Sequence, residues 1–237
     1  MKFLNLFFVP AFLLLNSMVS FSQKVNIGIG YNIGTHVKTT GLDFVIGRYN
    51  NTRTYLTTQM KSPAFFRGMN YSLDMYYMNY LMSFEWTGRK SDVWARGITS
   101  GVEFTRDLRC QVNSWNFGFG KKVNSKKYSV KGSYLGADLS MIILKNYTRV
   151  YKTNENVPEY TKINDDLTLG FSPFIQFVGN RFTAKVYGQL MIKQANYWDV
   201  NRVINPATWS GDFYENNKGK TSSLGFCLRY NLFKNGR

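Results

Sequence analysis

Hydrophobic and polar residues alternate with a period of two along most of the chain beyond residue 22, which is typical of β-strands with one apolar face. The alternation is clearest from Val25 to Ile33 and from Phe182 to Ile192, where small or polar residues separate the apolar ones. The pattern predicts strands over 25–33, 42–46, 76–86, 102–104, 115–119, 135–143, 167–175, 182–192 and 224–232. The sequence therefore predicts an all-β fold.

The connections between these strands alternate in length. Polar turns are expected at 50–53, 88–91, 124–127 and 179–181, and longer segments run over 148–166 and 199–219. Short turns on one side and long loops on the other are typical of transmembrane barrels. The spacing predicts a single antiparallel transmembrane β-barrel of about ten strands. A count of eight or twelve strands also remains open, because the alternation of apolar and polar residues has an uneven phase over 54–61 and 93–112.

Alternation alone also fits a soluble, lipocalin-like barrel with its apolar faces turned inward. Composition favours the membrane barrel, because 17% of the residues are aromatic and amphipathic rings prefer the headgroup region. Aromatic residues near predicted strand ends are Tyr49, Trp86, Trp94, Tyr128, Tyr147, Tyr197 and Trp198. Pro173 predicts a bulge or a shifted register, because proline cannot donate to the strand ladder.

The N-terminus has the order of a cleavable secretory signal. Lys2 precedes an apolar stretch from Phe3 to Leu15, and small residues follow at Ser20 and Ser22. This pattern predicts a signal peptide over 1–22. Residues 23–237 contain no Pro-, Gly- or Ser-rich linker, so one barrel domain is expected there.

The segment from Ser223 to Tyr230 resembles the C-terminal insertion signal of outer-membrane β-barrel proteins of diderm (Gram-negative) bacteria. Its polar residue, glycine, bulky apolar residue and aromatic residue are Ser223, Gly225, Leu228 and Tyr230. The resemblance implies passage through the periplasm, insertion by the barrel assembly machinery and residence in the cell outer membrane among membrane lipids. This chain differs from the family's pattern because residues 231–237 follow the motif. The resemblance implies no catalytic residue.

Charged residues fall on the face opposite the apolar one, which places them in the lumen. A lumen charge network is predicted from Asp43, Glu85, Glu103, Asp138, Lys185, Lys193 and Arg229. Opposite charges in a narrow lumen must pair, so the favoured interpretation is a salt-bridged plug in which Lys185 and Arg229 neutralise the carboxylates. A solute-selecting constriction or a hydrolytic acid pair is the alternative.

The formal net charge is +16, which in a cytosolic protein indicates nucleic-acid binding. An exported barrel argues against nucleic acid. Outward-facing basic residues such as Lys145, Arg149 and Lys152 either meet lipopolysaccharide phosphates or form a solvated rim.

Catalysis finds little support in the sequence. His36 is the single histidine, placed in a short first loop with no neighbouring Ser, Asp or Glu at a triad or metal-site spacing, and Asp199, Asp212 or Glu215 of the last loop could in principle approach it in space. We therefore expect no enzyme, no cofactor and no metal site. Cys110 and Cys227 either pair in an oxidising compartment or remain buried free thiols.

The function favoured by the sequence is a structural or interaction barrel of the cell envelope. Its long loops would contact a partner protein or surface component, with Trp209, Phe213 and Tyr214 as contact residues. The alternative is a small porin-like channel. Conductance in a lipid bilayer distinguishes the two.

Overall fold

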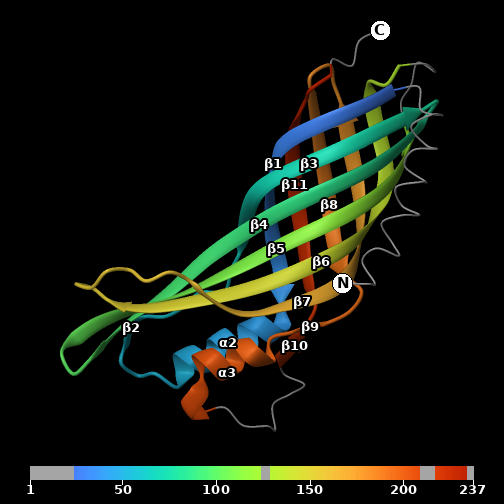
Figure 1. Cartoon of the computed structure of the whole chain (residues 1–237). Helices are drawn as coiled ribbons and strands as arrows, with labels where there is room; N and C mark the ends of the chain where they lie inside the picture. The colour runs from blue at the N-terminus through green and yellow to red at the C-terminus, as the bar shows by residue number, and fades with distance from the viewer. Residues whose placement is uncertain (1–23, 124–128, 209–216, 234–237) are drawn as a thin grey trace, which may run out of the picture.

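A computed structural model describes residues 24–123, 129–208 and 217–233 (Figure 1). The predicted signal peptide and the expected turn at 124–127 lie outside the described residues, as do Trp209, Phe213 and Tyr214. None of the helices in the described ranges is long and apolar enough to cross a membrane.

Within these ranges, eight strands close into one antiparallel ring in the order β4-β3-β1-β11-β8-β7-β6-β5, and the β4–β5 pairing completes it. The predicted antiparallel barrel is confirmed, with eight strands rather than the favoured ten. The strands are β1 (Lys24–Thr39), β3 (Phe65–Tyr77), β4 (Tyr80–Thr99), β5 (Val102–Lys122), β6 (Gly132–Lys152), β7 (Thr161–Val178), β8 (Phe182–Met191) and β11 (Thr221–Asn231).

The barrel is apolar outside and polar inside. Ile29, Phe117 and Leu139 project outward and are exposed, whereas Asn32 and Gln176 point inward and are fully buried. A soluble lipocalin-like barrel would have the opposite arrangement, because water would contact its outer wall. The exposed apolar wall, here called the apolar belt, is the surface of a barrel that crosses a lipid bilayer.

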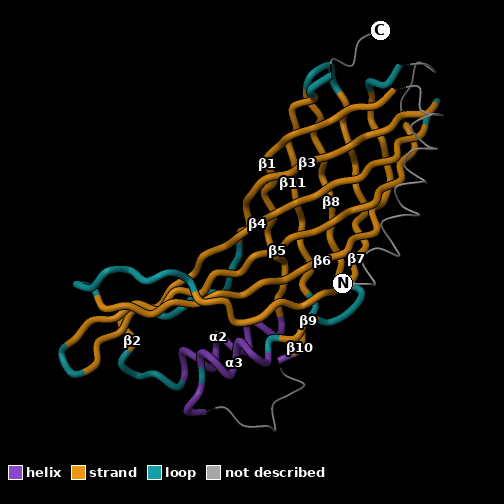
Figure 2. Tube along the Cα trace, viewed as in Figure 1, coloured by secondary structure: helices purple, strands orange, loops and turns teal. Residues whose placement is uncertain are grey.

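Four strands, β4 to β7, continue well beyond the barrel wall and form an extension, which Figure 2 shows leaning away from the remaining strands. On the outer face of β4 the apolar belt ends at Trp86, and Lys90 and Asp92 follow. On β5 it ends at Trp115, beyond which lies Arg109. The polar residues show that the extension lies outside the lipid layer.

Two helices cover the inner face of the extension at its junction with the barrel (Figure 1). They are α2 (Thr40–Asn51) and α3 (Trp198–Ile204), followed by the 3-10 helix η1 (Pro206–Thr208). Short strands β9 (Ala195–Asn196) and β10 (Lys218–Gly219) pair beside them, and β2 (Leu56–Thr58) pairs with the far part of β4. The helices and the extension share a buried core: Leu42, Val45, Ile46, Tyr49, Val200 and Ile204 pack with Ala95, Leu108, Cys110, Val112, Ile142 and Leu144.

The strand predicted over 42–46 is wrong, because this segment is part of α2. Leu42, Val45, Ile46 and Tyr49 have the helical spacing i, i+3, i+4, i+7 and all are buried. The alternation of Leu42, Phe44 and Ile46 was therefore coincidental. Tyr49 and Tyr197, expected near a lipid interface, lie in the buried core instead.

Two hairpin turns also differ from expectation. The predicted strand 76–86 spans a turn at Met78 and Asn79, between β3 and β4, where Met78 has a positive φ of 49°. The predicted turn at 88–91 lies inside β4, which continues to a turn at Ser100 and Gly101 with φ of 51° and 76°. The expected turn at 179–181 does connect β7 to β8.

Pro173 interrupts a ladder without shifting it. Ser172 and Pro173 have no pairing with β8, yet the pairs Phe171–Leu190 and Phe174–Tyr187 on either side keep one register. On the other side Pro173 pairs with Ala137 of β6. The bulge or register change expected at Pro173 is therefore absent from this part of the structure. The proline is accommodated because the ladder between β7 and β8 omits the pairs at Ser172 and Pro173.

Candidate functional site

The barrel lumen contains a buried charge cluster centred on Lys185. Its ammonium donates to Glu85 Oε2 at 2.8 Å and to Asp138 Oδ2 at 2.7 Å. The three side chains come from β8, β4 and β6 and are at most 3% exposed. In the ring order β8 lies opposite β4, so the Lys185–Glu85 pair crosses the lumen from wall to wall.

Arg229 on β11 adds a second cation to this cluster. Its guanidinium lies 3.4 Å from Asp74 Oδ2 and 3.4 Å from Glu85 Oε2, and it donates to Gln176 Oε1 at 2.7 Å. The group formed by Asp74, Glu85, Asp138, Gln176, Lys185 and Arg229 is called the lumen network below. Three carboxylates face two cations, and Asn70 donates a further hydrogen bond to Glu85 Oε1 at 2.7 Å.

A second cross-lumen connection lies nearer the helices. Arg89 on β4 donates to the hydroxyl of Tyr187 at 2.9 Å and to Gln189 Oε1 at 2.6 Å, both on β8. The Tyr187 hydroxyl donates in turn to Asn32 Oδ1 at 2.8 Å. Gly225 faces this ring, and a Cβ there would overlap Tyr187. Glycine therefore leaves the space that the large inward side chain occupies.

Little free space remains between these groups. A cavity lined by Glu85, Asp138, Ser172 and Tyr187 measures about 10 Å³. Another of about 10 Å³ lies between the barrel and the helices, beside His36, Phe66 and Cys110. A volume of roughly 10–15 Å³ holds about one water molecule. These two cavities can hold single waters but no larger solute.

Of the seven residues predicted to form the lumen charge network, the structure brings four together: Glu85, Asp138, Lys185 and Arg229. The other three lie elsewhere. Asp43 is in the first turn of α2. Glu103 is on the extension, where Thr153 donates to its carboxylate at 2.7 Å. Lys193 follows the end of β8 and is exposed. These placements are wrong because the alternation was extended beyond the barrel wall.

Asp74 and Arg89 were missed by the sequence analysis. The alternation could have identified both, because residues two positions apart in a strand share a face. Asp74 lies two residues from the inward Ser72, and Arg89 lies two residues from the inward Thr87. The misplaced turns hid this signal. Asp74 fell outside a predicted strand, and Arg89 fell inside a predicted turn.

The residues considered for catalysis are dispersed. His36 lies in β1, not in a loop, and its ring packs edge-on against Phe66 with centroids 4.0 Å apart. Asp199 pairs with Arg202 within α3 at 3.2 Å, and Asp212 and Glu215 lie outside the described residues. Cys110 and Cys227 are both buried free thiols.

The four residues of the C-terminal motif all lie in β11. Leu228 and Tyr230 point outward into the apolar belt, while Ser223 and Gly225 point inward. The predicted strand at 224–232 is thus placed with the expected faces. Its role as an insertion signal remains a prediction.

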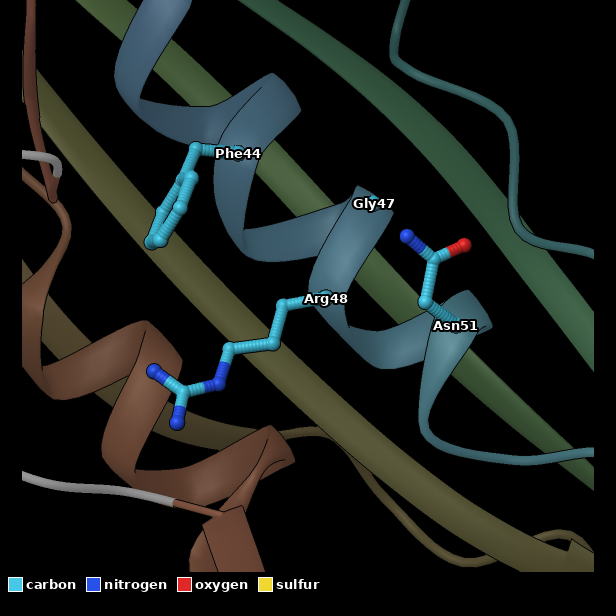
Figure 3. A pocket seen from close by; sticks show the side chains of 4 residues that line it. All are labelled: Phe44, Gly47, Arg48 and Asn51. Carbon is cyan, nitrogen blue, oxygen red and sulfur yellow. The ribbon is translucent and has the colours of Figure 1, made fainter.

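The end of the molecule that carries the helices has a shallow hollow on the exposed side of α2. It measures about 420 Å³ and is lined by Phe44, Gly47, Arg48 and Asn51. Figure 3 shows Arg48 directed from α2 toward the neighbouring helix, and Gly47 leaving the helix surface open. All four lining residues come from one helix, so the hollow is a surface depression and not an entrance to the lumen.

No family model and no curated protein matches the chain. Among solved structures, the chain is similar to the crystal structure of Neisserial surface protein A (NspA). The sequences are 9% identical, the TM-score is 0.33, and the match covers 88% of this chain and 99% of the other. With so little sequence in common, no residue role is transferred between the two proteins.

Proposed function

We propose that this protein is a non-conducting outer-membrane β-barrel that anchors an interaction surface outside the cell. The observation that carries the proposal is the lumen network, in which Lys185 joins opposite walls of the barrel through its ion pair with Glu85 and binds Asp138 of β6 through a second short pair. An eight-stranded barrel has an interior just wide enough for its side chains. Such a lumen offers no path to a solute unless the network opens.

Opening the network is energetically unfavourable. Removing one partner of a buried ion pair leaves the other charge unpaired in a low-dielectric interior, at a cost of about 3–5 kcal/mol. Arg229 and Lys185 together contact three carboxylates. A conducting state would have to break several of these contacts at once, so the favoured role for these charges is to hold the walls together.

The outer membrane is the proposed location because the apolar belt requires lipid and because β11 ends the barrel with the motif described above. Insertion by the barrel assembly machinery follows from the same motif. The belt would contact membrane lipids, and nucleic acid is not among the proposed partners.

The extension and its helices are the proposed interaction surface. α2 and α3 are fixed to the extension by a continuous buried core. They are fixed to each other by Arg53, which follows α2 and donates to Asn205 Oδ1 at 3.0 Å and to the carbonyl of Ile204 at 2.7 Å at the end of α3. A rigid surface of this kind loses little conformational freedom on binding. A protein of the cell envelope is the proposed partner class, and no catalysis is assigned.

The test begins with the full-length chain expressed in a Gram-negative host. Outer membranes are isolated, and the extracted protein is run on a gel with and without boiling. A heat-dependent mobility shift of membrane-bound protein supports the location, and a soluble periplasmic species contradicts it. The shifted protein is then reconstituted into planar bilayers. Absence of current steps supports the non-conducting barrel, whereas discrete steps at constant voltage would establish the porin-like alternative.

A further inference from the structure

The outer face of the extension carries a hollow of about 320 Å³ lined by arginine and aromatic side chains. This arginine hollow is formed by Trp94, Arg96, Arg109, Arg149, Tyr151 and Tyr160. They come from β4, β5, β6 and the segment just before β7. None belongs to the lumen network, and the hollow lies on the face opposite α2 and α3.

Two of the arginines are held in place around one ring. The guanidinium carbons of Arg109 and Arg149 lie 4.0 Å and 4.2 Å from the centre of the Tyr160 ring. Asp92 accepts two hydrogen bonds from Arg109, at 2.6 Å and 3.1 Å, and Asp107 accepts one from Arg149 Nε at 2.6 Å. Groups fixed in this way lose little side-chain entropy when a ligand binds.

Hydrogen-bond donors remain available at this site. Only Nε of Arg149 is used by a described residue, which leaves its two terminal nitrogens for a ligand. The guanidinium of Arg96 lies over the Trp94 ring, 5.0 Å from its centre, and has no hydrogen bond or ion pair with the residues that the structure describes. Three arginines against Asp92 and Asp107 leave one positive charge in excess. Planar guanidinium groups bind phosphate and carboxylate oxygens with two hydrogen bonds.

The aromatic residues suit a sugar. Trp94 is 46% exposed even though Arg96 lies over its ring, so it adds exposed apolar area to the hollow, and Tyr151 lines the same hollow. Large ring faces of this kind provide apolar contact area with a polar edge. A ligand that combines a ring-shaped body with an acidic group fits both features.

The distance of the hollow from the apolar belt indicates which kind of lipid could supply that ligand. Trp94 lies on the same face of β4 as Trp86, the last residue of the apolar belt, so the hollow faces outward on the side of the wall that contacts lipid, eight residues beyond the belt. Eight residues along a strand span ~26 Å, which at a barrel strand tilt of about 35–45° is a height of roughly 19–22 Å above the belt. A headgroup layer is only ~5–8 Å deep on each side of the bilayer. A phospholipid headgroup falls short of this site, whereas a lipid bearing a long saccharide reaches it.

We propose that the arginine hollow binds an acidic sugar, carrying a phosphate or carboxylate, in the core saccharide of lipopolysaccharide in the outer leaflet. This inference rests on the outer-membrane location proposed above. Bound saccharide would fix the extension relative to the membrane surface and so orient the interaction surface on its other side.

The test uses full-length protein in detergent, with folding verified by the heat-dependent gel shift. Tryptophan fluorescence is followed during titration with delipidated, phosphorylated core oligosaccharide and, separately, with inorganic phosphate. The test variant is Arg96→Gln with Arg149→Gln, and the matched control is Arg202→Gln with Lys162→Gln, which removes two charges outside the hollow. We expect the test variant to lose at least about tenfold in affinity for the oligosaccharide, because each arginine supplies charge-assisted hydrogen bonds, while the control binds like the wild type.

Equal affinity of the test variant and the wild type, or no binding by either, would overturn the proposal. Binding of inorganic phosphate as tight as that of the oligosaccharide would overturn the saccharide assignment and leave a general anion site. A folded protein found only in the periplasm would contradict the proposed location, and the same titration would still decide whether the hollow binds the sugar.

Discussion

The ammonium of Lys185 on β8 lies 2.8 Å from the carboxylate of Glu85 on β4, on the opposite wall of the barrel. The two residues are 100 positions apart in the sequence. The pair joins walls that are not neighbours in the ladder of strands. It therefore couples the stability of the barrel to the filling of its lumen.

Replacing Lys185 by Met should destabilise the barrel by about 3–5 kcal/mol, because Glu85 and Asp138 would lose their shared cation. Urea unfolding in detergent, followed by tryptophan fluorescence, measures the change. The control is Lys162→Met, which removes a pair with Asp165 in which both side chains are about half exposed, and which should cost less than about 1 kcal/mol. Equal losses for the two variants would refute the structural role of the lumen network.

Replacing the two carboxylates by neutral amides should restore much of the stability that the Lys185→Met variant loses. The triple variant Lys185→Met, Glu85→Gln, Asp138→Asn removes the uncompensated charges together with the cation. Buried ion pairs replaced as a unit are often close to neutral in stability. A triple variant less stable than Lys185→Met alone would contradict this electrostatic account.

Gly68→Ala should prevent correct closure between β3 and β4. A Cβ at this position would overlap the backbone carbonyl oxygen of Gly88 on the paired strand, and backbone cannot move aside as a flexible side chain does. Overpacking typically costs about 1–3 kcal/mol, occasionally more. The fraction of protein showing the heat-dependent gel shift measures closure.

The matched control for Gly68→Ala is Gly47→Ala in α2, where a Cβ would meet no atom within 4 Å. Alanine is favoured over glycine in a helix by up to about 1 kcal/mol. This variant should fold as well as the wild type. A defect at Gly47 equal to that at Gly68 would show that the close approach of β3 and β4 is not the cause.

Asn205→Ala should loosen α2 and α3 while leaving the barrel closed. The buried Asn205 amide donates to the carbonyl of Val45 at 3.2 Å and to Asn201 Oδ1 at 2.8 Å, and its oxygen accepts from Arg53. Leaving buried polar groups unpaired costs about 1–3 kcal/mol. Limited proteolysis should cleave the helical region faster, with an unchanged gel shift. Arg202→Gln, in an exposed pair, should leave the cleavage rate unchanged.

The Cys110 thiol should resist alkylation in the folded protein. It lies on the extension, outside the apolar belt, and burial raises its pKa from 9.0 to about 12, with a smaller contribution from Asp92. Thiolate is the reactive form, so iodoacetamide at pH 8 should label Cys110 only after unfolding. The measurement uses a Cys227→Ala background, in which Cys110 is the only thiol.

The same shift in the pKa of Cys110 predicts a dependence of stability on pH. Because the folded pKa is the higher one, this contribution is fully present below the unfolded value near 9 and is lost as pH rises toward about 12. Between these values the free energy of unfolding should fall by up to about 1.4 kcal/mol per pH unit relative to Cys110→Ala. Parallel pH profiles for the two proteins would contradict the burial of the thiol.

The sequence by itself determined which face of most strands is apolar. Alternation is a local property, because successive side chains of a strand point to opposite sides whatever the strand pairs with. The ranges 25–33, 135–143, 182–192 and 224–232 all lie within or overlap strands of the barrel, with their apolar residues outward. Glu85, Asp138, Lys185 and Arg229 were placed inside by the same argument.

Only the tertiary structure decided how many strands close the ring and which charges meet across it. Lys185 reaches Glu85 because eight strands place β8 opposite β4, and strand number and register depend on pairing between distant segments. Leu42 to Tyr49 fits both a strand and a helix locally. Packing against Leu108, Val112 and Ile204 favours the helix, because burial of an apolar face outweighs local preference.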